Sequence, residues 1–215
     1  MNTALQLWHK IIDEQQLAAT SEAGSHPHAP EEYAHLFHGT GDGGTTEVEY
    51  LNLIHALVLA TKPETLLETG SERGMGTLAI ACAIAANGFG KLYSVDLEPS
   101  DRLRNNLRNY GLEDYVEVVA NHSITHCATW LGAPYDFAFF DSDVHCRARE
   151  HDILRRRGKL APGAVCVFHD TSSIRYGVST SFEYIRYTEA APGLTLPLSR
   201  GLKIVQDPPQ TFDYP

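Results

Sequence analysis

The chain of 215 residues is long enough for one well-buried domain and short for two. Its hydrophobic content of 43% and charged content of 20% are those of an ordinary globular protein. A formal net charge of -10 disfavours binding to nucleic acid or to an anionic membrane, because the summed field repels phosphate groups. No apolar run approaches membrane-spanning length, and the four cysteines show no C-x-x-C spacing, so we expect reduced thiols and a cytoplasmic location.

Residues 1–45 are predicted to form an N-terminal helix followed by a flexible flap. Apolar side chains recur at helical spacing over 1–22, and their stripe covers either the core or a partner subunit, as in a homodimer. Residues 23–45 are rich in glycine and histidine, without the spacing of a zinc-binding helix. We interpret the four histidines as loop residues and the segment as a flap that closes over an active site. They are His26, His28, His35 and His38.

From residue 46 onward, helical and strand patterns alternate, which predicts one domain over 46–215. The predicted helices are 46–61, 78–87, 101–110, 124–131, 147–159 and 178–189. The predicted strands are 65–68, 91–96, 115–120, 136–141, 164–168, 194–198 and 202–205. The fourth strand is almost continuously apolar, which favours burial on both faces. The order predicts an α/β fold with a doubly wound, mostly parallel seven-stranded sheet and an antiparallel C-terminal hairpin.

A glycine turn follows the first predicted strand, with the pattern Glu68-x-Gly70-x-x-x-Gly74-x-Gly76. Glycine adopts backbone angles that other residues avoid and lets a ligand lie against the main chain. No Lys-Ser/Thr pair follows the last glycine, so the turn is not a phosphate-binding P-loop. Asp96 ends the next strand, about 20 residues on, where a nucleotide fold places the acid that binds ribose hydroxyls. The combination predicts a nucleoside site, with capping of the following helix as the alternative role of Asp96.

Polar side chains also follow the other predicted parallel strands, and ligands of open α/β sheets bind beyond these carboxyl ends. Asn121, His122 and Ser123 follow the third strand, 141–145 ends the fourth, and 169–171 follows the fifth. A loop placed there only for solubility does not need carboxylates and imidazoles at every strand end. We therefore expect these groups to line one ligand site.

The stretch 135–171 resembles the signature of a group of class I S-adenosylmethionine (SAM) methyltransferases that includes macrocin O-methyltransferases and cephalosporin-hydroxylase-associated proteins. That group has a strand ending in Asp-Gly-Asp-x-x-His or similar, a helix carrying an acid, a Pro-Gly turn, a strand and His-Asp. The matching residues here are Asp141-Ser142-Asp143-Val144-His145, Asp152, Leu160-Ala161-Pro162-Gly163 and His169-Asp170. The glycine turn resembles the first motif of the same class. Ser142 and Ala164 depart from the pattern, since the group commonly has glycine at both positions.

The resemblance implies a Rossmann-like SAM-binding domain with a divided ligand site. The turn would hold the methionine part of SAM, and Asp96 would bind the ribose. Asn121, His122 and Ser123 would flank the adenine, and Asp141 would lie between the cofactor and the methyl acceptor. The turn residues that we assign to the cofactor are Glu68, Gly70, Ser71, Gly74 and Gly76.

Methyl transfer to a hydroxyl needs an oxygen in line with the sulfonium, and deprotonation makes that oxygen a better nucleophile. One device is a divalent metal such as Mg²⁺ held by Asp141, Asp170 and Asp143, which lowers the pKa of a bound hydroxyl. The other is a histidine base, His145 or His169. Asp170 has a turn-capping role as its alternative, and His169 has a positioning role.

We therefore predict a SAM-dependent O-methyltransferase of a small hydroxylated molecule, with or without a divalent metal. A nicotinamide-dependent oxidoreductase of the same layered fold is one alternative. The glycine spacing argues against it, and no Tyr-x-x-x-Lys pair occurs in the sequence. The other alternative is a non-catalytic SAM-binding or scaffold protein, dimeric through the N-terminal helix.

Overall fold

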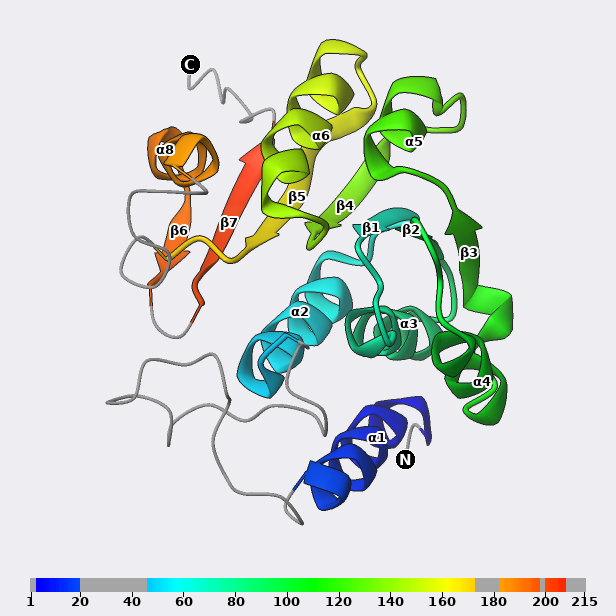
Figure 1. The fold of residues 1–215 in the computed structure, drawn as a ribbon. Helices are drawn as coiled ribbons and strands as arrows, with labels where there is room; N and C mark the ends of the chain where they lie inside the picture. The colour runs from blue at the N-terminus through cyan, green and yellow to red at the C-terminus, as the bar shows by residue number, and fades with distance from the viewer. Residues whose placement is uncertain (1–2, 20–45, 173–181, 198–199, 208–215) are drawn as a thin grey trace, which may run out of the picture.

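The computed structural model describes residues 3–19, 46–172, 182–197 and 200–207 (Figure 1). It has one central sheet between layers of helices, which confirms the predicted α/β architecture. The predicted flap at 23–45, with its four histidines, lies outside the described residues. Among the residues that are described, no helix combines the length and the apolar character that crossing a membrane requires.

Seven strands form the sheet, and their order explains where a ligand can bind. The strands are β1 (Thr65–Thr69), β2 (Lys91–Asp96), β3 (Val116–Ala120), β4 (Tyr135–Phe140), β5 (Leu160–His169), β6 (Leu194–Leu196) and β7 (Leu202–Asp207). Their order in the sheet is β3-β2-β1-β4-β5-β7-β6. The first five pair in parallel, and β7 lies antiparallel between β5 and β6. Because β2 and β4 lie on opposite sides of β1, the winding reverses there and leaves a crevice at the strand ends.

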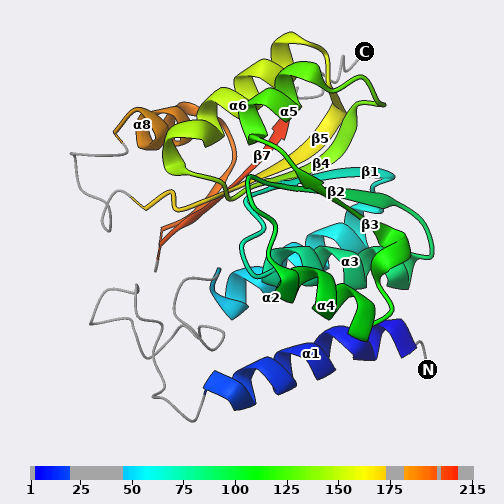
Figure 2. The ribbon, with the colours of Figure 1, turned by 45° about the vertical axis from the view of Figure 1, so that its right-hand side comes forward.

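The helices lie on both faces of the sheet (Figure 2). One layer consists of α2 (Val48–Thr61), α3 (Met75–Asn87) and α4 (Asp101–Asn109), with α1 (Thr3–Ala19) packed on its outer side. The other consists of α5 (Ser123–Thr129), α6 (Val144–Arg156) and α8 (Phe182–Ala190). A 3-10 turn, Glu113–Tyr115, precedes β3.

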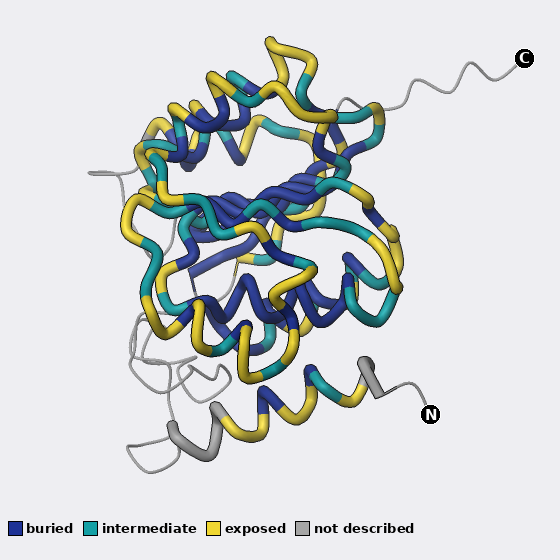
Figure 3. Tube along the Cα trace, turned by 90° about the vertical axis from the view of Figure 1, so that its right-hand side faces the viewer, coloured by how far each residue is buried: buried dark blue, intermediate teal, exposed yellow. Residues whose placement is uncertain are grey.

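The sheet separates two hydrophobic cores, and its central strands are the most deeply buried part of the chain (Figure 3). Phe137 and Phe139 of β4 belong to the core beneath α2 and α3. Ala138 and Phe140 of the same strand belong to the core beneath α6. All four side chains are inaccessible to solvent, which confirms the prediction of a strand buried on both faces.

The apolar stripe of α1 packs on the chain's own core. Trp8, Ile11 and Ile12 are buried in the same cluster as α2 and α3. The indole N–H of Trp8 donates to the Oδ1 atom of Asn52 at 2.9 Å, and the ring stacks on His55. The sequence left open whether this stripe packs on the core or on a partner subunit, and the structure shows it packed on the core. A homodimer through the helix stays a prediction.

Two helices, α3 and α6, begin three residues earlier than the sequence predicts, because a cap lies further upstream. The α3 helix begins at Met75 rather than 78, directly after Gly74, whose φ is +90°. The α6 helix begins at Val144 rather than 147, since the side chain of Asp143 accepts a hydrogen bond from the backbone N–H of His145 at 2.8 Å. The earlier start of α6 places Arg147 one turn into the helix, beside the ends of β4 and β5.

Candidate active site

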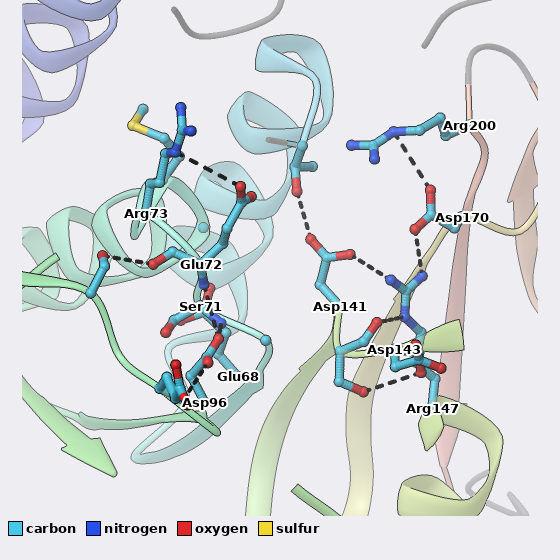
Figure 4. Close-up of a pocket in the computed structure, with 17 residues that line it drawn as sticks. Glu68, Ser71, Glu72, Arg73, Asp96, Asp141, Asp143, Arg147, Asp170 and Arg200 are labelled. Atoms are coloured by element: carbon cyan, nitrogen blue, oxygen red, sulfur yellow. Dashed lines mark hydrogen bonds and ion pairs between the residues drawn. The ribbon is translucent and has the colours of Figure 1, made fainter. Parts of the chain in front are cut away.

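A cavity of about 550 Å³ lies at the carboxyl ends of the parallel strands, at the point where the winding reverses. On one side its wall is formed by the glycine turn after β1 and by Asp96 at the end of β2 (Figure 4). On the other side it is formed by Asp141, Arg147, Asp170 and Arg200. The volume is that of a small-molecule site, so a bound ligand can contact both sides.

The glycine turn lies directly against the end of β4. Gly70 has a φ of +82°, and a Cβ atom added to it would collide with the backbone carbonyl of Asp141. Only glycine combines this backbone angle with so close an approach. A Cβ atom added to Gly76 would collide with the carboxylate of Glu68. Gly74 caps α3 and does not line the cavity. The predicted turn residues that do line it are Glu68, Gly70, Ser71 and Gly76.

Glu68 fastens the turn to two neighbouring elements. Its Oε2 atom accepts hydrogen bonds from the hydroxyls of Thr77 in α3 and Ser94 in β2, the second at 2.8 Å. Burial raises the pKa of Glu68 to about 8, against the two hydroxyl hydrogen bonds that lower it; the nearby carboxylates of Asp141 and Asp96 raise it by smaller amounts. A group held in this way supports the turn and is mostly protonated below about pH 8.

The pKa of Glu68 makes the stability of the fold dependent on pH. The unfolded carboxyl titrates near 4.5 and the folded one near 8, so folding takes up a proton between these values. The free energy of unfolding should therefore fall as the pH rises from about 4.5 to about 8, by on the order of 1 kcal/mol per unit. Glu68→Gln should remove this part of the slope in urea unfolding measured across that range. Glu113→Gln, at an exposed glutamate, should keep it; equal slopes in wild type and E68Q would refute the assignment.

Asp96 organises the turn from the second strand. Its Oδ2 atom accepts hydrogen bonds from the backbone N–H groups of Ser71 at 2.9 Å and Glu72 at 3.0 Å. Its Oδ1 atom accepts from the backbone N–H of Glu98 at 3.0 Å. The alternative role as a helix cap is wrong, because the side chain of Ser100 caps α4. Asp96 thus joins the ends of β1 and β2 and lines the cavity as predicted.

A second hollow of about 180 Å³ adjoins the main cavity beyond Gly70 and Asp96. His122 and Ser123 line it, as predicted from their place after β3. Asn121 does not line it; its backbone N–H donates to the carbonyl of Asp96 at 2.9 Å. The sequence reasoning missed the apolar wall formed by Leu97 and Cys146. Leu97 is 67% exposed, and an apolar residue directly after the strand-end acid is the signal that could have identified it.

His169 is enclosed behind the cavity wall. It is inaccessible to solvent, its Nδ1 atom lies 2.8 Å from Oδ1 of Asp141, and its Nε2 atom lies 2.8 Å from Oε2 of Glu47. Burial alone would lower its pKa, but the carboxylates of Asp141, Asp170 and Glu47 outweigh burial and raise the pKa to about 9. The geometry brings His169 to Asp141 and not to the cavity, which fits the positioning role that the sequence left open.

Arg147 bridges the carboxylates at the ends of β4 and β5. Its Nη2 atom lies 3.1 Å from Oδ1 of Asp141, and its Nη1 atom lies 2.8 Å from Oδ2 of Asp170. Arg200 stands on the far side of Asp170, and its backbone N–H donates to Oε1 of Glu47 at 3.0 Å. Three carboxylates and three basic groups therefore meet at this wall. We call them the charge cluster: Glu47, Asp141, Arg147, His169, Asp170 and Arg200.

Two of the predicted residues, Asp143 and His145, lie at the start of α6, outside the charge cluster. Asp143 caps α6 at the rim of the cavity, and His145 is exposed on that helix and does not line the cavity. Asp141, His169 and Asp170 offer ligand-type atoms within 4.8 Å of one another. Among the described residues this is the one group of three such side chains, and Asp143 is not part of it. Of the predicted metal-binding residues, the structure thus brings together two.

Comparisons with known proteins agree with this architecture. A family model described as a methyltransferase domain matches residues 67–171. No curated protein matches the chain in sequence. Similar solved structures include the O-methyltransferase TomG from Streptomyces achromogenes in complex with SAM, with 18% identity, 76% of this chain and 81% of that chain covered, and a TM-score of 0.64.

Two further structures are similar over more of the chain. The O-methyltransferase from Bacillus cereus in complex with S-adenosylhomocysteine (SAH) has 18% identity, covers 93% of this chain and 89% of that chain, and has a TM-score of 0.60. The SAH-bound methyltransferase PaMTH1 from Podospora anserina has 15% identity, covers 92% and 96%, and has a TM-score of 0.64. At such identities the likeness concerns the fold. The family match identifies residues 67–171 as a methyltransferase domain, and the fold is the one found in the SAM- and SAH-bound methyltransferase structures.

Proposed function

We propose that this enzyme is an O-methyltransferase that acts on a small hydroxylated molecule and is related to the macrocin O-methyltransferase group. One observation carries the proposal: a single cavity joins the glycine turn and Asp96 on one wall to Asp141 on the other. A cofactor held at the first wall and an acceptor held at the second would meet within it. The structures from Streptomyces and Bacillus that are named O-methyltransferases support transfer to oxygen.

The cofactor half follows from the contacts of the turn. The methionine part of SAM would lie along Gly70 and Ser71, and the ribose would bind Asp96, whose carboxylate faces the cavity. The adenine would enter the second hollow, between Leu97 and the segment of His122 and Ser123. An apolar side chain offers a flat ring a surface from which water is excluded. The acidic lining also favours a cationic sulfonium.

Asp141 is the group best placed to receive the acceptor's proton. It lines the cavity, and its Oδ2 atom accepts a hydrogen bond from the hydroxyl of Thr46 at 2.7 Å. In the proposed step the acceptor hydroxyl would give its proton to Asp141, while bound SAM would supply the methyl group to its oxygen. The products are the methyl ether, SAH and one released proton. His169 orients Asp141 through its hydrogen bond and does not touch the acceptor.

The match to a methyltransferase domain argues against the oxidoreductase alternative. Metal assistance is not part of the proposal, because protein cations already contact Asp141 and Asp170. Small acceptors are favoured over large ones by the volume of the cavity.

The test has two stages, binding and transfer. SAH should bind the purified full-length protein in calorimetric titration at a ratio of one to one. SAH release should then be measured from SAM with paired acceptors that differ only in a hydroxyl or an amine at one position, such as phenol and aniline derivatives. Turnover of hydroxyl members, with a loss of kcat in Asp141→Asn and unchanged SAH affinity, supports the proposal. Turnover of the amine members alone contradicts it.

A further inference from the structure

We propose that Arg147 is the fixed cation of the charge cluster, the wall of the cavity where the acceptor would bind. It takes the position between Asp141 and Asp170 that a divalent metal would need. The inference deepens the proposed function and rests on it for the meaning of that wall. In this role Arg147 is a positioning residue: it balances and orients the two carboxylates, and methyl transfer proceeds without a bound metal.

The bridge between the carboxylates is direct and buried. One guanidinium reaches both groups, with Nη2 at 3.1 Å from Asp141 and Nη1 at 2.8 Å from Asp170, and its side chain is 4% exposed. Arginine is charged at every physiological pH, and its planar fork matches carboxylates on two sides. It therefore supplies permanently the charge that a metal ion would bring.

Arg147 is held in place by more than these two carboxylates. Its Nε atom donates to the carbonyl of Ser142 and its Nη1 atom to the carbonyl of His169, both at 2.6 Å. Its guanidinium carbon lies 5.7 Å from the centre of the Tyr184 ring. A metal ion entering the bridge would have to pull the guanidinium away from all of these partners. A buried charge that loses its partners is strongly unfavourable.

The carboxylate oxygens themselves are already engaged. Oδ1 of Asp141 lies 2.8 Å from Nδ1 of His169, and Oδ2 accepts from Thr46 at 2.7 Å. Oδ1 of Asp170 lies 3.5 Å from Nε of Arg200. Both nitrogens of His169 face carboxylate oxygens, so neither offers a metal a lone pair. Mg²⁺ demands near-octahedral oxygen coordination. The arrangement therefore does not fit the magnesium site expected from the sequence.

The experiment measures Mn²⁺ binding to the chelator-stripped full-length protein by electron paramagnetic resonance of the free ion. Wild type should show no site tighter than about 1 mM, the weak limit of carboxylate sites. Arg147→Gln should gain one site at least about tenfold tighter, because removal of a unit charge in direct contact with both carboxylates exposes them to the metal. Arg147→Lys keeps the charge and should behave as wild type. Arg149→Gln, at an exposed arginine of the same helix, is the matched control and should also behave as wild type.

Two results overturn the assignment. One is a wild-type site that binds Mn²⁺ more tightly than about 1 mM, within the range of functional divalent sites. The other is a folded Arg147→Gln protein that gains no affinity for the metal. If circular dichroism shows that this variant does not fold, the wild-type titration still decides between the two outcomes. In wild type, methyl transfer should also survive treatment with EDTA, and loss of transfer that Mg²⁺ restores overturns the assignment as well.

The readout separates this inference from the proposed function. Mn²⁺ binding is measured without SAM or acceptor, so it does not depend on turnover. If SAH fails to bind while the Mn²⁺ results are as expected, the proposed function fails and the assignment of Arg147 stands. If SAH binds and wild type also binds Mn²⁺ tightly, the proposed function stands and the assignment fails.

Discussion

Asp96→Ala is expected to lower the affinity for SAH by at least about 100-fold. Two charge-assisted hydrogen bonds to the ribose hydroxyls would be lost, and each is worth about 1.5–3 kcal/mol. The same substitution removes the acceptor for the backbone N–H groups of Ser71 and Glu72, so the turn also loses its anchor. Calorimetric titration with SAH measures the change directly.

The control for this prediction is Asp114→Ala. Asp114 is also an acidic residue near the sheet, but it is exposed in the 3-10 turn before β3 and does not line the cavity. SAH affinity should be unchanged there. Asp96→Asn, which keeps one acceptor oxygen, should fall between wild type and the alanine variant. Unchanged SAH affinity in a folded Asp96→Ala protein means that the ribose is bound elsewhere.

Gly70→Ala is expected to lower the free energy of unfolding by about 2–5 kcal/mol, since a left-handed backbone costs about 1–2 kcal/mol and a collision in a packed site costs a further 1–3 kcal/mol. The added Cβ atom meets the backbone of Asp141, which cannot move without shifting β4. Urea unfolding followed by circular dichroism gives the value. SAH binding should be lost as well, because the turn and the wall that carries Asp141 move apart.

Gly88→Ala separates the two costs. Gly88 ends α3 with a φ of +81°, almost that of Gly70, yet an added Cβ atom there has no neighbour within 4 Å. This variant should lose only about 1–2 kcal/mol, the cost of the backbone angle alone. Equal losses at the two glycines would show that the close approach to Asp141 contributes nothing.

The sequence located the residues of the glycine-turn wall because their signals are local; their contacts with a cofactor stay a prediction. The turn, Asp96 and the residues after β3 each follow a strand that periodicity alone identifies, and the topology of parallel sheets brings strand ends together. The seven-stranded sheet and its C-terminal hairpin were confirmed for the same reason. Boundaries were less accurate, because caps such as Asp143 lie outside the periodic pattern.

The acceptor half was only partly predictable. Asp141, His169 and Asp170 stand at strand ends and were identified. Glu47 and Arg200 were missed because their contact joins residues 153 positions apart, which no periodicity reveals. Arg147 was missed for a different reason. Asp143 was assigned to a metal and not to a helix cap, and the predicted helix therefore began at Arg147. In the structure the Asp143 cap starts α6 at Val144, and Arg147 lies one turn into it, beside Asp141 and Asp170.

The contact between Glu47 and Arg200 also orders the assembly of the enzyme during synthesis. The turn, β2 and the residues after β3 leave the ribosome early and can pack while later strands are still being made. The charge cluster cannot form completely until Arg200 has left the ribosome, because Arg200 is 153 positions after Glu47, with which it makes a hydrogen bond. Contacts of such long range form late in folding. A nascent or truncated chain that stops before residue 200 would thus carry the glycine-turn wall of the cavity without a complete charge cluster.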